Sequence, residues 1–310
     1  MSSSRTLAWL KYRFIGDAVL ATPLLHALAQ NFPAPDVLVS PHLKTLLSGE
    51  PGMNLVDLLP QRGFSAIRRT VLSIRKQRYD TVVLVNRNYR SALLARVAGI
   101  KRRIGHDTEG RAWLLTDPVP YDPMAFEGLA YANLGSPLGL NVPAHPPRLT
   151  LRPGERERGD ELRAGATVMF QPGATVADRT FPTVTSAEII NALSAEGHRV
   201  ALIGGAAERS FVEPLLPLLN EAPVDLVGAC SLRETMGVLQ GGSVLVAPDS
   251  GMVHVSAAMG LPTVTTFSLS PSSKWGHDYP PHRIFSAPEC AMPRMDVGAV
   301  IDAAREILGR

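Results

Sequence analysis

The apolar segments of this 310-residue chain alternate between strand-like and helix-like patterns, and they do so in two series. In the first series, the β-branched run 80–86 (DTVVLVN) precedes a segment of helical periodicity at 91–98. The second series begins with a strand at 167–171 and ends with a helix over 296–308. Strands that alternate with helices through short turns predict an α/β fold built on parallel sheets.

The stretch 143–165 (PAHPPRLTLRPGERERGDELRAG) separates the two series, and its Pro, Gly and charged residues are typical of a linker. We therefore expect one domain over 1–150 and a second over 151–295, which suits the chain length. A last helix follows over 296–310. Ligands of such sheets bind at the carboxyl ends of the strands, so we expect the site in the cleft between the domains.

The charge is distributed unevenly between the two halves. Residues 1–155 contain 19 Lys and Arg against 11 Asp and Glu, whereas residues 156–310 contain 12 against 17. A basic half attracts anions such as phosphates, acidic lipids or nucleic acid, although an ordinary solvated surface is the alternative. Aromatic residues make up only 6% of the chain, which argues against a base-stacking platform and a nucleic-acid partner.

The two cysteines, Cys230 and Cys290, form no CxxC pair, so zinc ribbons and redox motifs are excluded. This cysteine usage predicts a reducing compartment. We recognise neither a signal peptide nor an apolar run long enough to span a membrane, and we expect a cytoplasmic location.

The common nucleotide and hydrolase motifs (GxGxxG, GxxxxGK[ST], HExxH and GxSxG) are absent, which disfavours dehydrogenases, NTPases, zincins and α/β-hydrolases. Polar turns after predicted strands remain. In the first of them, Gly16-Asp17, the carboxylate lies at a helix N-terminus, where its ionised form is favoured. Asp17 can therefore act as a general base, and a helix cap without chemistry is the alternative.

Two turns of the second series suit a phosphorylated ligand. Backbone N–H groups in 171–175 (QPGAT) can bind an anion, and Arg179 can neutralise a diphosphate. In 247–254 (APDSGMVH), Asp249 can accept hydrogen bonds from sugar hydroxyls, Ser250 and the amides near Gly251 can hold a phosphate, and His254 can donate. A capped helix is the alternative, and a hydrolytic triad is disfavoured because neighbouring positions rarely give triad geometry.

Gly204-Gly205 and Glu208 form a further turn, in which the glycines permit close approach of a ligand. Glu208 can bind ribose hydroxyls, and a solvated Glu at a helix start is an equal alternative.

Several stretches in the correct order resemble one family, the heptosyltransferases of glycosyltransferase family 9. They are GDAVLATPLLHALAQNFP, NRNYRSALLARVAGIKRRIGHDTEGR, QPGA with RTFP, VALIGG, VGACSLRETMGVL and PDSGMVHVSAAMGLPTV, and they span about 9–285. The central stretch is most similar to the heptosyltransferase II type. The resemblance implies a GT-B fold, in which two Rossmann-like domains face each other across a cleft and the last helix packs back toward the N-terminal domain.

The resemblance also implies an inverting reaction that needs no metal or other cofactor. A sugar, with ADP-heptose as the expected donor, moves to a bacterial surface glycan such as the lipopolysaccharide inner core. Asp17 matches the general base of the family. The implied donor-binding residues are Gly173, Ala174, Thr175, Arg179, Glu208, Cys230, Asp249, Ser250, Gly251 and His254. The implied acceptor-binding residues are Gly16, Asn88, Arg90, Lys101, Arg102 and Arg103.

One departure from the family pattern concerns the diphosphate. The family commonly has Lys followed by Trp-Pro, whereas this chain has Arg179 followed by Phe181-Pro182. Arginine keeps the positive charge, but its planar fork is not equivalent to an ammonium.

The basic acceptor region fits a phosphorylated or acidic lipid-linked glycan, and it can also hold the protein against an anionic bilayer. Two alternatives stay open. A GT-B nucleotide-sugar epimerase would need acid and base carboxylates beyond Asp17, and a non-catalytic relative would bind the nucleotide sugar without transferring it.

Overall fold

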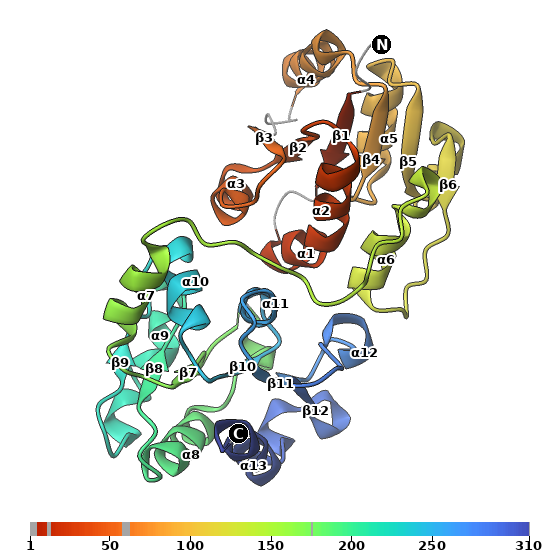
Figure 1. Cartoon of the computed structure of the whole chain (residues 1–310). Helices are drawn as coiled ribbons and strands as arrows, with labels where there is room; N and C mark the ends of the chain where they lie inside the picture. The colour runs from red at the N-terminus through yellow and green to blue at the C-terminus, as the bar shows by residue number, and fades with distance from the viewer. Residues whose placement is uncertain (1–4, 11–13, 58–62, 175, 310) are drawn as a thin grey trace. The chain divides into compact units, whose positions relative to one another are not determined.

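A computed structural model describes residues 5–10, 14–57, 63–174 and 176–309 (Figure 1). The chain divides into two compact units, Met1–Leu149 and Thr150–Arg310. The division falls at the domain boundary that the sequence predicts, directly beside residue 150. Each unit is described by itself below, as unit 1 and unit 2.

Unit 1 contains a six-stranded sheet in the order β3-β2-β1-β4-β5-β6, and all neighbouring strands are parallel. The strands are β1 (Thr6–Trp9), β2 (Asp36–Val39), β3 (Asn54–Asp57), β4 (Thr81–Leu84), β5 (Arg102–His106) and β6 (Asp117–Val119). The helices are α1 (Ile15–Leu20), α2 (Thr22–Asn31), α3 (Pro41–Leu47), α4 (Phe64–Gln77), α5 (Tyr89–Val97) and α6 (Glu127–Asn133), with the 3-10 turns η1 (Ala112–Leu114) and η2 (Ser136–Leu138).

Unit 2 contains a second six-stranded parallel sheet, in the order β12-β11-β10-β7-β8-β9. Its strands are β7 (Val168–Phe170), β8 (Val200–Leu202), β9 (Val224–Asp225), β10 (Val244–Pro248), β11 (Thr263–Phe267) and β12 (Arg283–Ser286). Its α-helices are α7 (Glu155–Arg163), α8 (Thr183–Ser194), α9 (Arg209–Val212), α10 (Leu232–Gln240), α11 (Gly251–Ala258), α12 (Ser272–Trp275) and α13 (Val297–Leu308). Its 3-10 turns are η3 (Ala177–Arg179), η4 (Ala206–Glu208), η5 (Leu216–Leu218), η6 (Pro288–Cys290) and η7 (Met292–Arg294).

The two sheets have the same topology. When each unit's strands are counted from its own first strand, both orders read 3-2-1-4-5-6, which is the Rossmann arrangement. The predicted α/β class is therefore confirmed. In such a sheet the strand order reverses between the first and fourth strands, and the crevice at their carboxyl ends is the usual ligand site. That position lies beside β1 and β4 in unit 1, and beside β7 and β10 in unit 2.

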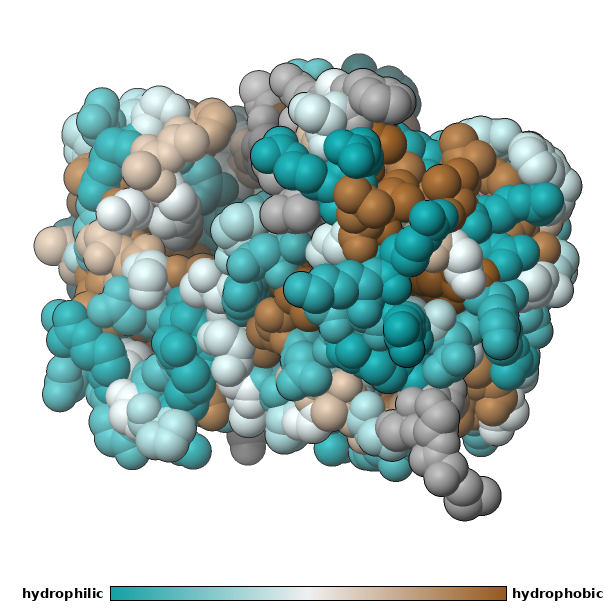
Figure 2. Space-filling model, turned by 90° about the horizontal axis from the view of Figure 1, so that it is seen from above, coloured by the Kyte–Doolittle hydropathy of each residue, from teal (hydrophilic) through white to brown (hydrophobic). Residues whose placement is uncertain are grey.

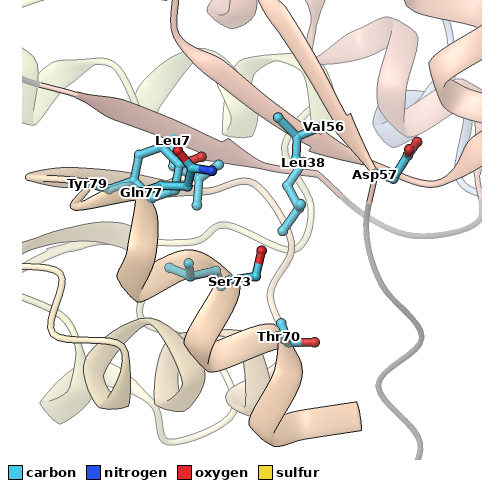
Figure 3. A pocket seen from close by; sticks show the side chains of 9 residues that line it. Leu7, Leu38, Val56, Asp57, Thr70, Ser73, Gln77 and Tyr79 are labelled. Atoms are coloured by element: carbon cyan, nitrogen blue, oxygen red, sulfur yellow. The ribbon is translucent and has the colours of Figure 1, made fainter.

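In unit 1, α4 and α5 pack against one face of the sheet. Val71 and Ile74 of α4 share a buried cluster with Ala92 and Ala95 of α5. A small pocket remains between α4 and strands β1 to β3, and Figure 3 shows the side chains that line it. Its volume of ≈ 40 Å³ is far below the several hundred Å³ that a drug-sized ligand occupies, so this pocket is a packing gap.

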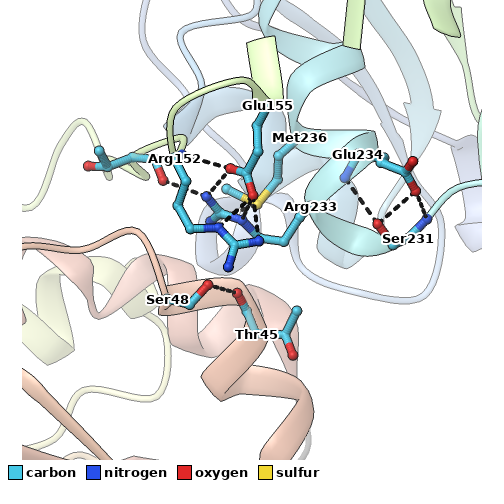
Figure 4. A network of polar contacts seen from close by, with 9 residues as sticks. Thr45, Ser48, Arg152, Glu155, Ser231, Arg233, Glu234 and Met236 are labelled. Atoms are coloured by element: carbon cyan, nitrogen blue, oxygen red, sulfur yellow. Dashed lines mark hydrogen bonds and ion pairs between the residues drawn. The ribbon is translucent and has the colours of Figure 1, made fainter. Parts of the chain in front are cut away.

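In unit 2, α7 packs closely against α10. A Cβ at Gly159 would lie only 2.1 Å from the carbonyl carbon of Gly237, so the two backbones can approach only because both residues are glycine. The buried Arg233 on α10 donates its Nε to Glu155 Oε1 at 3.0 Å (Figure 4). Burial raises the pKa of Glu155, but hydrogen bonds from Arg233 and Arg152 outweigh this effect and lower the pKa to about 2. A charged pair therefore fixes α7 on α10.

The last helix, α13, belongs to the core of unit 2. The Asp296 side chain caps it by accepting from the Ala299 N–H at 3.0 Å. Its buried residues, which include Val300 and Ala304, share a cluster with Ile190 and Leu193 of α8. The expected packing of 296–310 toward the first domain stays a prediction.

Within the described ranges, no helix combines the length and the apolar character needed to cross a bilayer.

Candidate functional site

The crevice of unit 2 brings together three of the polar turns that the sequence singles out. Gln171 follows β7, Ser250 follows β10, and Glu208 ends the turn after β8. Ser250 Oγ donates to Gln171 Oε1 at 2.7 Å, and Gln171 Nε2 donates to Glu208 Oε1 at 2.8 Å. One glutamine therefore links the turns from three neighbouring strands.

Glu208 is folded back over the glycine turn. Its Oε2 accepts the Gly205 N–H at 2.7 Å, and a Cβ at Gly204 would lie 2.3 Å from the same oxygen. A side chain at 204 would therefore displace the Glu208 carboxylate from this turn, and the φ of +159° at Gly204 is one that other residues rarely adopt. Burial raises the pKa of Glu208, although the hydrogen bonds from Gln171 and Gly205 act in the opposite direction.

Arg179 and Asp249 form an ion pair in the same crevice, with Arg179 Nη1 3.1 Å from Asp249 Oδ2. The Arg179 side chain is about one-third exposed and Asp249 is nearly buried, so the pair lies at the surface of the crevice. The arginine thus presents a positive charge where the sequence predicts diphosphate binding, and the pair uses only one nitrogen of Arg179 and one oxygen of Asp249.

The turn after β7 differs in detail from the prediction. A Cβ at Gly173 would lie 2.4 Å from Phe211 Cδ2, so glycine is required there by packing. The Ala174 N–H, which the sequence suggests as an anion donor, instead donates to Thr180 Oγ1 at 3.1 Å. Thr175 lies outside the described residues.

His254 on α11 is buried and belongs to a hydrogen-bonded chain. Its Nδ1 lies 3.0 Å from His277 Nε2, and His277 Nδ1 lies 3.2 Å from the Tyr279 hydroxyl. Burial raises the pKa of Tyr279 to about 12, so its hydroxyl stays protonated and can donate to His277. Hydrogen bonds thus join the two imidazole rings to each other and His277 to the Tyr279 hydroxyl. Sequence analysis missed this hydrogen-bonded chain, because its members join only in the fold.

Cys230 lies on the turn after β9, two strands away from β7 in the sheet order. Burial raises the pKa of its thiol, so the thiol is not activated as a nucleophile. Gly251 begins α11 directly after Ser250. The remaining predicted donor residues therefore lie at the carboxyl edge of this sheet.

In unit 1, Asp17 lies in the first turn of α1 at the carboxyl end of β1, and Gly16 precedes it. Both residues are buried. The hydroxyl of Tyr131, a fully buried residue on α6, donates to Asp17 Oδ1. Burial, together with the carboxylates of Asp17 and Glu127, raises the pKa of Tyr131 well above its ordinary value. The hydroxyl is therefore a neutral donor to the Asp17 carboxylate.

Behind Tyr131, a second carboxylate is held by two donors. Glu127 is fully buried and forms an ion pair with Arg87, and it accepts a hydrogen bond from the Tyr121 hydroxyl at 2.9 Å. The Arg87 guanidinium also lies 4.1 Å from the centre of the Tyr121 ring. Sequence analysis missed Glu127 and Tyr131, and the one available signal was an acidic residue within the apolar stretch FEGLAYANLG.

Two predicted acceptor residues lie at the same edge of the sheet as Asp17. Asn88 caps α5 by accepting from the Ser91 N–H at 2.8 Å, and Arg90 is exposed on the first turn of that helix. The buried Arg111 donates to the carbonyl oxygens of Asn86 and Asn88 at 2.9 and 3.1 Å. This loop after β4 is therefore held in place by Arg111.

The other predicted acceptor residues, Lys101, Arg102 and Arg103, lie at the opposite edge. They precede or begin β5, whereas Asp17 follows the end of the parallel strand β1. Arg102 pairs with Asp117, and Arg103 Nε donates to the Leu114 carbonyl at 2.7 Å. These three residues therefore lie at the amino ends of the strands and away from Asp17, and their acceptor-binding role stays a prediction.

In the part of the chain that the structure describes, no group of three or more His, Cys, Asp or Glu residues is arranged to hold a metal ion.

Comparisons with known proteins give one family. The model of "Glycosyltransferase family 9 (heptosyltransferase)" matches residues 67–301. The chain is 28% identical over 282 residues to lipopolysaccharide heptosyltransferase 2 of Escherichia coli K12, with 83% of this chain and 81% of that protein covered.

Solved structures agree with the fold. The structure of a glycosyltransferase family 9 protein from Veillonella parvula aligns with a TM-score of 0.87 at 16% identity, covering 99% of this chain and 98% of that one. The structure of E. coli ADP-heptose lps heptosyltransferase II aligns with a TM-score of 0.84 at 23% identity, covering 98% of both chains. These alignments confirm the predicted GT-B fold class.

Proposed function

The chain belongs to glycosyltransferase family 9, and from this premise we propose that it transfers heptose from ADP-heptose to the core of lipopolysaccharide, with inversion and without a metal ion. The name of the E. coli relative supports heptose as the sugar and lipopolysaccharide as the acceptor. The matched E. coli structure is that of an ADP-heptose lps heptosyltransferase II, which supports ADP-heptose as the donor.

The observation that supports this proposal most directly is the polar cluster at the strand-order reversal of unit 2. A nucleotide sugar needs a cation for its diphosphate and acceptors for its hydroxyl groups. Arg179 supplies the cation, and Asp249, which pairs with it, and Glu208, which accepts from Gln171, supply carboxylate acceptors at the carboxyl ends of the two strands that flank β7. A ligand that combines phosphate with hydroxyl groups fits this set better than a purely apolar or purely anionic ligand.

In the proposed reaction, an acceptor hydroxyl attacks the anomeric carbon from the face opposite the diphosphate. The new O–C bond forms as the bond between the anomeric carbon and the phosphate oxygen breaks. The hydroxyl proton goes to Asp17, and the diphosphate leaves as an anion whose charge Arg179 stabilises. Tyr131 holds the Asp17 carboxylate by donating to one of its oxygens.

The acceptor side of the proposal uses Asn88 and Arg90, which lie at the same sheet edge as Asp17. An exposed arginine suits a phosphorylated inner-core glycan. Such an acceptor is linked to a lipid, so the proposal includes a cytoplasmic enzyme in peripheral contact with the inner membrane.

The test is calorimetric titration with ADP, UDP and GDP, with Mg²⁺ or with a chelator, followed by a transfer assay with ADP-heptose. We expect ADP to bind more tightly than UDP or GDP, equally with and without Mg²⁺, and ADP-heptose to be consumed only when acceptor is present. A preference for UDP or GDP would refute ADP-heptose as the donor. ADP binding without transfer to any core acceptor would favour a non-catalytic relative.

A further inference from the structure

The outer face of α4, α5 and η1 in unit 1 exposes apolar side chains to solvent. Leu72 on α4 is 47% exposed, Val97 on α5 is 49% exposed, and Trp113 in η1 is 59% exposed. Tyr89 and Leu93 precede Val97 at helical spacing on α5 and are exposed as well. Figure 2, which views the molecule from above, shows hydrophobic side chains at the surface between hydrophilic ones.

These side chains belong to one continuous surface. The helices α4 and α5 pack side by side, since Arg75 Nη2 on α4 donates to the Val97 carbonyl on α5 at 2.7 Å. The rings of Tyr89 and Trp113 lie 6.3 Å apart, and the Arg96 guanidinium lies 5.3 Å from the centre of the Trp113 ring. The apolar patch therefore extends across both helices to η1.

The charge of this surface is predominantly positive. Residues 64–103 include eleven Lys and Arg but a single acidic residue, Asp80. Arg68, Arg69 and Lys76 lie three or four positions from Leu72 on α4, so cations flank the apolar side chain. Within the described ranges, no carboxylate forms an ion pair with these three cations. Glu109, whose carboxylate accepts the Tyr89 N–H, is the acidic group at the start of α5.

A pocket opens at the edge of the same surface, between the C-terminal ends of α4 and α5. Its volume is ≈ 370 Å³, and its lining includes Arg75, Arg78 and Lys101. The pocket also includes Asp80, one of whose carboxylate oxygens accepts the Arg5 N–H at 3.0 Å. Three cations around one pocket suit a phosphate-bearing headgroup.

We propose that the outer face of α4, α5 and η1 docks on an anionic lipid bilayer. An apolar stripe bordered by arginine and lysine is the pattern of an interfacial membrane surface, in which the apolar side chains enter the headgroup region. A nucleic acid would require the cations but not the aliphatic residues between them. Helix α5 begins at the sheet edge where Asp17 lies, so one end of the surface is next to that edge. A bilayer docked on the surface would therefore lie beside the edge at which the acceptor is proposed to bind. Only this last step rests on the proposed function.

The test is co-sedimentation of the full chain with vesicles of phosphatidylcholine alone or with added phosphatidylglycerol. We expect binding only to the anionic vesicles. Since each cation near such a surface contributes about a fivefold gain in affinity, R68Q/R69Q together weaken binding by about 25-fold. Trp113→Ala weakens binding by about tenfold, because its exposed ring no longer enters the interface. Thermal unfolding of each variant is the control for folding, and we expect these exposed substitutions to leave the melting temperature unchanged.

Matched controls come from unit 2. The variant R156Q/R199Q removes the same charge from exposed arginines, and Val184→Ser removes an exposed apolar side chain. Both controls should bind vesicles as the unmodified chain does. Equal losses in the controls, or no loss in the α4 and η1 variants, would overturn the proposal. Binding to DNA that depends on Arg68 and Arg69 but not on Trp113, without vesicle binding, would assign the surface to nucleic acid. Vesicle binding requires no transfer reaction, so a failure of this proposal is distinguishable from a failure of the transfer assay with ADP-heptose.

Discussion

The two units have the same strand order, yet they present different chemistry at the equivalent position. After its first strand, unit 1 has a buried carboxylate, Asp17, held by a tyrosine. After its first strand, unit 2 has the glycine turn at Gly173 and then Arg179, paired with Asp249. The fold thus determines where a ligand can bind, and the few residues after each strand determine which ligand. In the proposed function, proton transfer therefore belongs to unit 1 and donor binding to unit 2.

The largest effect should come from Asp17→Asn, which tests whether proton transfer belongs to unit 1. The amide keeps the size of the side chain but cannot accept the acceptor proton. We expect turnover to fall by about 1,000-fold, within the range for loss of a general base. The affinity for ADP should stay unchanged, because the substitution lies in unit 1. Initial rates with ADP-heptose measure the turnover, and calorimetry with ADP measures the affinity. Turnover at the original rate would refute the role of Asp17 as the general base.

The second prediction concerns the stability of unit 2, in which an ion pair holds α7 on α10. In Glu155→Gln, the nearly buried Arg233 loses its charged partner. The pKa of Glu155 is about 2 in the folded state, below the value of about 4.3 in an unfolded chain, so the ionised carboxylate, through its contacts with Arg233 and Arg152 together, stabilises unit 2 by about 3 kcal/mol above pH 4.3. This contribution is lost as the pH falls from about 4.3 toward 2.

Urea unfolding measures this difference, with fluorescence of Trp275 as the signal for unit 2, since the other tryptophans, Trp9 and Trp113, lie in unit 1. The control is Glu161→Gln, which removes an exposed pair with Arg158 on the same helix and should cost less than about 1 kcal/mol. A loss that persists unchanged at pH 2 would contradict the assignment to this ion pair.

The sequence predicted most of unit 2's crevice, because each of its turns is local. The stretch APDSGMVH shows the pattern of a buried strand followed by polar residues and glycine. Parallel strands bring such turns together at the carboxyl edge of the sheet. The segment 119–142 offered no such pattern, and helix α6 was not predicted. Tyr131 and Asp17 are 114 residues apart, so only the fold could reveal their contact.

The basic cluster at 101–103 teaches a different point. The residues Lys101, Arg102 and Arg103 are basic and lie in the stretch that resembles the acceptor region, but a basic sequence does not show at which end of a strand it lies. The structure places Arg102 at the first position of β5, at the amino edge of the sheet. The direction of the strand, rather than the charge of its residues, therefore decides which cations lie at the same sheet edge as Asp17.

The third prediction tests whether Arg179 of unit 2 binds the diphosphate of the donor. Arg179→Gln should weaken ADP binding by about 20-fold, because a charge-assisted contact to the diphosphate is lost. Arg179→Lys should retain most of the affinity, since it keeps the charge without the planar fork. Calorimetry with ADP measures both variants. Arg90→Gln in unit 1 is the matched control and should leave ADP affinity unchanged, and an equal loss there would contradict the division between the units.

The smallest effect should come from Tyr131→Phe, which tests how unit 1 holds its base. The ring still fills the buried site, but the Asp17 carboxylate loses the hydroxyl that holds it in place. We expect kcat to fall by about tenfold with an unchanged Michaelis constant for ADP-heptose, because a base that is held less firmly transfers the proton less efficiently. A merely structural role would change the Michaelis constant and the thermal stability as well. Tyr131 also hydrogen-bonds to Glu127, so Tyr121→Phe, which removes another hydroxyl that donates to Glu127, is the matched control. An equal loss in both variants would place the effect at Glu127 rather than at Asp17.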